Sequence, residues 1–137
     1  MNQNNQDRIK KIAANRPKGG GAASKSASLT TTNPVTFQDW LFFGTEPDIF
    51  VNVGIVPNSS SVVVTYAVVV IQTPDEYILS DATFAPSNPT ESVPYNLATD
   101  SGTFSISQYG NQVEAWAFVQ TNEGDQYSDT QSYTVSS

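Results

Sequence analysis

The sequence contains no cysteine and no histidine among its 137 residues. Without cysteine, a disulfide framework, a thiolate metal site and a cysteine nucleophile are all excluded. Without histidine, the chain lacks the commonest general base and the commonest protein ligand of transition metals. Most enzyme mechanisms therefore lack the side chains that they need, and we expect a non-enzymatic protein with no cofactor and no metal.

Basic residues are missing from most of the chain. All six lie before residue 26, where Asp7 is the only acid, so this segment has a net charge of +5. The remainder holds twelve acids and no base, which makes the overall charge −7. Such asymmetry indicates either an interaction tail or a solvated, disordered tail, attached in both cases to an acidic body.

Long apolar runs are absent as well. No stretch reaches the ~18 apolar residues of a membrane span, and Met1 to Lys25 lacks the apolar core of a secretory signal. The length suits one domain with an appendage. Hydrophobic residues make up 38% of the chain and charged residues 14%, with abundant Ser, Thr, Asn and Gln. This composition is typical of extracellular or virion β-proteins, and we expect a soluble one.

The N-terminal arm, residues 1–32, combines a peptide with a tether. Residues 7–15 could form a short helix that aligns Ile9, Ile12 and Ala13 on one face, and Pro17 would stop it. So short a helix is marginal alone and needs a partner surface. Residues 19–28 are Gly, Ala, Ser and Lys, the composition of a flexible linker. The residues that we expect to bind a partner are Arg8, Ile9, Lys10, Lys11, Ile12, Arg16 and Lys18.

The body, residues 33–137, alternates apolar and polar residues, with turn residues about every ten positions. This pattern predicts short antiparallel strands in a sandwich or barrel. The apolar run from Val62 to Ile71 is rich in β-branched residues and suits a central strand buried on both faces. We expect seven strands: Val35–Phe43, Asp48–Val56, Ser61–Gln72, Tyr77–Phe84, Thr103–Ser107, Gln112–Thr121 and Gln126–Val135.

The C-terminal residues carry a family resemblance. The strand Gln112–Thr121, with its Val113-x-Ala115-x-Ala117 pattern, is followed by a loop with Gly124 and a final Tyr133-Thr134-Val135. This segment resembles the last hairpin of immunoglobulin-like or fibronectin type III-like domains. The resemblance implies an all-β, immunoglobulin-like antiparallel sandwich of about seven strands behind an extended N-terminal arm. The cysteine pair and the tyrosine-corner pattern are missing, so a small jelly roll stays open.

Two aromatic residues of that strand are candidates for a surface contact. Trp116 and Phe118 share a face opposite Val113, Ala115, Ala117 and Val119. Core packing is the usual role of aromatic residues in strands. If the small residues face the core instead, the aromatic residues form an exposed patch or an intersubunit contact.

Carboxylates are the only catalytic-grade groups in the body. Asp75 and Glu76 share one turn, and paired acids can hydrolyse glycosides when a fixed gap separates them. Solvated turn acids are far commoner, so we assign no catalytic residue. Loop oxygens could also bind Ca²⁺, but their spacing matches no calcium-loop motif. The residues of that loop group are Asn122, Glu123, Asp125 and Asp129.

The basic arm and the immunoglobulin-like body together resemble accessory or decoration proteins of viral capsids, especially of tailed phages. That resemblance implies a non-enzymatic protein on the capsid surface, oligomeric within the assembly. Its arm, residues 1–25, would bind a capsid or other particle protein. Its sandwich would face outward, where it meets a host-surface ligand or cements neighbouring subunits.

Two alternatives stay open. One is the coat protein of a small virus whose arm binds packaged nucleic acid, although the arm has few charges and its binding would be weak. The other is a cell-surface adhesion or carbohydrate-binding module that uses Trp116 or the acidic loops. The second alternative leaves the basic arm unexplained.

Overall fold

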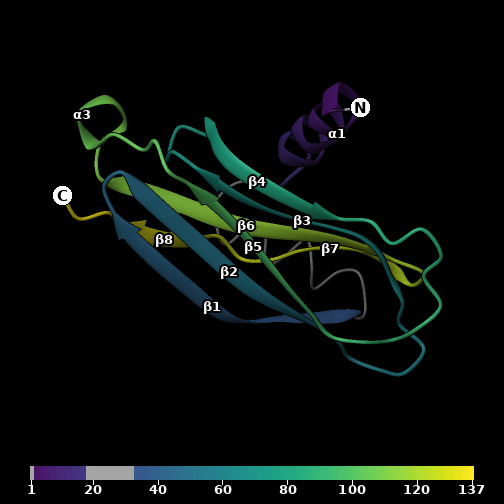
Figure 1. The fold of residues 1–137 in the computed structure, drawn as a ribbon. Helices are drawn as coiled ribbons and strands as arrows, with labels where there is room; N and C mark the ends of the chain where they lie inside the picture. The colour runs from purple at the N-terminus through teal and green to yellow at the C-terminus, as the bar shows by residue number, and fades with distance from the viewer. Residues whose placement is uncertain (1, 18–32) are drawn as a thin grey trace. The chain divides into compact units, whose positions relative to one another are not determined.

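The computed structural model describes residues 2–17 and 33–137 (Figure 1). The chain divides into two units, residues 1–33 and 34–137. In the first unit, helix α1 spans Asn2–Ala14, so it begins five residues before the expected Asp7 and ends one residue before the expected Asn15. The amide of Asn15 still donates to Lys11 O at 3.1 Å. Pro17 follows closely, and the residue before a proline disfavours the helical conformation.

The second unit is a β-sandwich of two antiparallel sheets, with three and five strands (Figure 1). The smaller sheet has the order β1-β2-β5, and the larger has the order β4-β3-β6-β7 with β8 also paired to β6. The strands are β1 (Val35–Thr45), β2 (Asp48–Pro57), β3 (Val64–Gln72), β4 (Ile78–Phe84), β5 (Tyr95–Ser101), β6 (Gln112–Thr121), β7 (Gly124–Tyr127) and β8 (Gln131–Thr134). One short helix, α3 (Ile106–Tyr109), lies between β5 and β6.

The hydrophobic core lies between the sheets and follows from period-two alternation along the strands. In the smaller sheet, the central strand β2 turns alternate apolar residues inward, from Ile49 to Ile55. In the larger sheet, β3 and β6 do the same and pair in the register Val69 with Ala117. The core residues of these three strands are Ile49, Val51, Val53, Ile55, Val64, Ala67, Val69, Ile71, Val113, Ala115, Ala117 and Val119.

Strand β3 is buried on both faces, as expected for the run of β-branched residues. Its residues from Tyr66 to Gln72 are all nearly inaccessible, although only alternate ones belong to the core between the sheets. The others, Tyr66, Val68, Val70 and Gln72, lie on the opposite face of the larger sheet. The five-stranded sheet is therefore apolar on two faces, whereas a sandwich sheet usually has one solvated face.

The strand assignments fail in two places. The expected strand Thr103–Ser107 is wrong, because this segment makes a turn into α3, and the fifth strand is Tyr95–Ser101. Strand β5 was missed because its alternation rests on Leu97 and Thr99 alone, a weak signal. The expected last strand, Gln126–Val135, is divided into β7 and β8, which pair with different parts of β6.

Within residues 2–17 and 33–137, no helix is long and apolar enough to cross a membrane.

Candidate functional site

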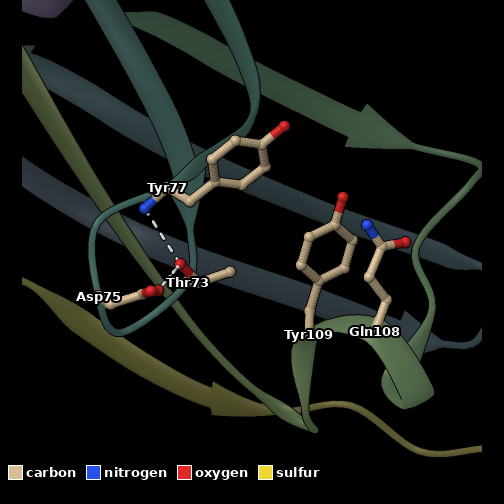
Figure 2. A pocket seen from close by; sticks show the side chains of 5 residues that line it. All are labelled: Thr73, Asp75, Tyr77, Gln108 and Tyr109. Atoms are coloured by element: carbon tan, nitrogen blue, oxygen red, sulfur yellow. Dashed lines mark hydrogen bonds between the residues drawn. The ribbon is translucent and has the colours of Figure 1, made fainter.

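A cavity lies at one end of the sandwich and is lined by two segments distant in sequence. It has a volume of about 430 Å³ and is lined by Thr73, Asp75, Tyr77, Gln108 and Tyr109 (Figure 2). The first three come from the loop between β3 and β4. The last two come from α3, on the connection between β5 and β6.

The β3–β4 loop is held in shape by Thr73. Its backbone amide donates to Tyr77 O at 2.9 Å, and its carbonyl accepts from the Glu76 amide at 2.8 Å. Its hydroxyl accepts from the Tyr77 amide at 3.0 Å and also donates to the Asp75 carboxylate. Glu76 takes the left-handed conformation, with φ of 75°, which closes the turn. These bonds fix the positions of Asp75 and Tyr77 at the rim of the cavity.

Helix α3 is anchored to the β1–β2 hairpin. Glu46 Oε2 accepts from the amide of Ile106 at 3.1 Å, which satisfies a donor in the first turn of the helix. Just before α3, the amide of Phe104 donates to Pro47 O at 2.9 Å. Phe104 is buried, and its ring stacks on Tyr109 with centroids 5.6 Å apart. Tyr109 is therefore supported from behind by the core.

The two tyrosine rings of the cavity lie nearly parallel. Their centroids are 5.9 Å apart and their planes differ by 18°. Tyr77 is 58% exposed, whereas Thr73 is buried. Figure 2 shows the Tyr109 hydroxyl and the Gln108 amide side by side, both directed away from α3, with Tyr77 opposite them on the loop. The cavity thus combines a flat aromatic wall with a carboxylate, an amide and two phenol groups.

Trp116 and Phe118 do not form the exposed patch that the sequence suggested. The small residues of β6, such as Ala115 and Ala117, do face the core, and the two aromatic residues lie on the opposite face. However, Trp116 is 0% and Phe118 4% exposed. Both pack against the ring of Tyr127, with centroid distances of 6.2 and 4.6 Å. A role of this face in binding another molecule stays a prediction.

The acidic loop around Glu123 has structural contacts. The Asn122 side chain accepts from the Val63 amide at 2.8 Å and donates to Ser61 O at 2.9 Å, so it joins two loops. Glu123 accepts from the Ser61 hydroxyl at 2.6 Å. In the described part of the chain, no three Asp or Glu side chains gather closely enough to hold a metal ion. The calcium interpretation of Asn122, Glu123, Asp125 and Asp129 therefore has no support in the geometry.

The expected partner-binding residues of the arm lie on and after α1. Arg8, Ile9, Lys10, Lys11 and Ile12 are within the helix, and Arg16 follows its end. Lys18 and the expected Gly/Ser linker fall outside the described residues. The helical spacing aligns Ile9 and Ile12 on one face, as the sequence predicted.

Four of the cavity residues were not singled out from the sequence: Thr73, Tyr77, Gln108 and Tyr109. The sequence pattern places Tyr77 at the start of a strand and does not mark the other three. An aromatic residue directly after a turn was a usable clue that Tyr77 belongs to a binding surface. No local sequence pattern indicates that Tyr77 lies beside α3.

No protein-family model matches the chain, and no curated protein sequence matches it. Solved structures do resemble it. A DUF3823 family protein from Parabacteroides merdae has a TM-score of 0.53 at 14% identity, over 75% of this chain and 53% of that one. A DUF3823 family protein from Bacteroides ovatus has a TM-score of 0.53 at 9% identity, over 76% of this chain and 56% of that one.

A solution structure of a late embryogenesis abundant (LEA) protein has a TM-score of 0.47 at 14% identity, over 96% of this chain and 87% of that one. The chain spans little more than half the length of each of the two DUF3823 proteins. At identities this low, their likeness shows the fold alone: residues 34–137 form a β-sandwich.

Proposed function

We propose that this chain is a non-enzymatic structural protein of a virus particle, a capsid decoration or accessory protein. The N-terminal arm anchors it to the shell, and the sandwich is displayed outward. The observation that carries the proposal is the division of the chain into two units of opposite charge. A domain that is anchored by one segment and displayed by another needs two parts of different chemistry, whereas a domain with one task does not.

The arm has the chemistry of a docking peptide. Helix α1 carries Arg8, Lys10 and Lys11 together with Ile9 and Ile12. An amphipathic helix of this kind binds by placing its apolar face in a groove, while its charges contact the acidic rim of the partner. Ile9 and Ile12 are 0% and 8% exposed in the structure, so docking in a partner groove requires this face to become accessible first. Burial of each isoleucine side chain against the partner then contributes about 1.5–3 kcal/mol.

The strand order supports an immunoglobulin-like class for the sandwich. A constant-type immunoglobulin domain has a first sheet of four strands, with the fourth strand beside the fifth, and a second sheet of three. Here β4 pairs with β3 in the larger sheet, and β5 pairs with β2. The fourth strand therefore pairs with the third strand and not with the fifth, unlike in a constant-type immunoglobulin domain. We infer that the domain is closer to fibronectin type III-like domains than to constant-type immunoglobulin domains. Domains of this architecture commonly serve binding and display rather than catalysis.

The anchor is tested on purified particles of the virus that encodes the chain. Three forms are compared: the full chain, the form without residues 1–25, and a variant with Ile9→Ser and Ile12→Ser. We expect quantitative immunoblots of the particle fraction to show the full chain and to lose both altered forms. The matched control carries Asn5→Ser and Gln6→Ser, which place two serines in the same helix without removing apolar surface.

Circular dichroism of each form establishes that the strand signal of the sandwich is retained. Full incorporation of the form without residues 1–25 would contradict the anchor and make the sandwich itself the docking surface. Absence of the full chain from the particles would contradict the virion assignment as a whole.

A further inference from the structure

The cavity between the β3–β4 loop and α3 has the chemistry of a small saccharide site. Sugars present a flat face of C–H groups and an edge of hydroxyl groups. The first suits the face of an aromatic ring, and the second suits groups that both donate and accept hydrogen bonds. Tyr77 and Tyr109 supply the rings, and Asp75 and Gln108 supply the polar groups. A few polar groups around an apolar wall is the usual composition of a small-molecule site.

The angle between the two tyrosine rings indicates that the cavity suits a sugar better than a cation. Cages for quaternary ammonium groups enclose the charge between the faces of several aromatic rings. The rings of Tyr77 and Tyr109 are stacked, 18° from parallel with centroids 5.9 Å apart, so they leave no room for a cation between their faces and form a wall rather than a cage. A wall of this kind offers an extended flat surface, which a pyranose ring covers well.

The charge of the sandwich restricts the sugar to a neutral one. Residues 34–137 contain twelve acids and no base, and Asp75 stands at the rim of the cavity with Glu76 beside it in the loop. The field of such a domain repels anions and does not act on a neutral ligand. Sialylated and sulfated sugars are therefore disfavoured, as are nucleotides, whose phosphates would meet the Asp75 carboxylate.

The site is also organised before any ligand arrives. The Thr73 bonds fix the loop that carries Tyr77, and the buried Phe104 ring supports Tyr109 from behind. A ligand therefore orders few side chains when it binds, which lowers the entropic cost of binding. The cavity is open and shallow, with only Thr73 fully buried among its lining residues, so one or two sugar rings fit better than a long enclosed chain.

We propose that Asp75, Tyr77, Gln108 and Tyr109 form a binding site for a neutral saccharide, with the sugar ring stacked on the tyrosine wall. The carboxylate of Asp75 accepts from sugar hydroxyl groups, and the amide of Gln108 both donates and accepts. This site goes beyond the proposed anchoring and does not depend on where the arm is bound.

The test is a titration of the isotope-labelled full chain, followed by amide signals in nuclear magnetic resonance. The probes are neutral trisaccharides of glucose, of mannose, of galactose and of N-acetylglucosamine, with a sialylated trisaccharide and a triarginine peptide as charged comparators. We expect at least one neutral sugar to bind with a Kd of about 1 mM or tighter. Its signal changes should be confined to residues 73–77 and 106–110.

Three variants assign the binding to the cavity. Tyr77→Ala should weaken the neutral sugar about 10-fold or more, and Gln108→Ala should weaken it by a smaller factor. Phe43→Ala is the matched control, because Phe43 is an aromatic residue on β1, 62% exposed and outside the cavity lining. It should leave the affinity unchanged. The unaltered signals of the core residues show that each variant is folded.

Three results would overturn the saccharide site. One is a failure of every neutral sugar to bind up to about 10 mM. Another is tighter binding of the triarginine peptide at the same residues, which would make this a cation site. The third is an equal affinity of the Tyr77→Ala variant. None of these results bears on the anchor, because all are measured on the isolated chain without particles.

Discussion

The indole Nε1 of Trp116 donates a hydrogen bond of 2.8 Å to Oε1 of Gln72, and neither side chain is more than 1% exposed. The two residues lie on adjacent strands, β6 and β3, on the face of the larger sheet that points away from the core. The other end of the Gln72 amide donates to Glu114 at 3.1 Å. Gln72 thus allows a tryptophan to be fully buried with its polar N–H paired.

This bond predicts a non-additive effect on stability. Gln72→Leu removes the acceptor of the buried indole N–H and should lower the free energy of unfolding by about 1–3 kcal/mol. In the double variant with Trp116→Phe, both polar partners of the bond are gone. Urea unfolding of the four forms should therefore show a double variant less destabilised than the sum of the two single ones. Strict additivity would mean that the bond does not couple these residues.

A second prediction concerns Ser128, which makes the hydrogen bonds to Ala117 of β6 that a paired strand makes elsewhere along β6. Strand β7 pairs with residues 118–121 of β6 and β8 pairs with residues 112–115, so Ala117 lies in the gap. The buried amide of Ala117 donates to the Ser128 hydroxyl at 2.8 Å, and the Ser128 amide donates to Ala117 O at 2.9 Å. Ser128→Ala should cost about 1–3 kcal/mol, because a buried N–H loses its acceptor.

The matched control for Ser128 is Ser132→Ala, at an exposed position on β8. It should change the free energy of unfolding by no more than about 0.5 kcal/mol in the same urea titration. If the two variants were equally stable, backbone contacts alone would hold β6 across the gap.

The third prediction concerns alkaline pH. Burial raises the pKa of the Tyr133 phenol above its ordinary value of 10.0, and its ring stacks on Phe42 with centroids 4.3 Å apart. Burial, together with the Glu91 carboxylate, also raises the pKa of Tyr95. In both cases the folded state favours the neutral phenol. Their stabilising contribution is therefore complete below the ordinary pKa and is lost as pH rises through the raised one.

Thermal unfolding followed from neutral pH to above pH 10 measures this loss. Tyr133→Phe should remain folded at neutral pH and should lose less stability on the alkaline side than the unaltered chain, because it has no phenol to ionise at this position. Identical alkaline slopes for the two proteins would show that Tyr133 does not contribute.

The fourth prediction concerns nucleic acid. Only the arm can neutralise phosphates, and its net charge of +5 limits the number of counterions released to about five. The acidic sandwich reduces the affinity further by repulsion. We expect weak binding to DNA or RNA, with a plot of log affinity against log salt no steeper than about −5. Micromolar binding at physiological salt, measured by fluorescence anisotropy, would favour the coat-protein alternative.

Much of the β-structure was readable from the sequence, because strands buried on one or two faces leave a pattern of their own. The alternation in residues 48–57 and 112–121 and the continuous apolar run ending at Ile71 predicted β2, β6 and β3 to within a few residues. The pattern failed where contacts outside the segment decide the conformation. Around Phe104, the carbonyl of Pro47 and the carboxylate of Glu46 hold the chain in a turn and a short helix instead of a strand.

The sequence by itself determined the charge division, the classes of chemistry that the missing cysteine and histidine exclude, and the strands of the core. Only the tertiary structure decided which side chains meet. Trp116 finds its acceptor 44 positions away, and the rings of Tyr77 and Tyr109, which come from two separate connections, stack with centroids 5.9 Å apart. The reason is physical: alternation tells a side chain which face of its own strand it occupies, whereas its neighbours depend on the order and register of the strands beside it.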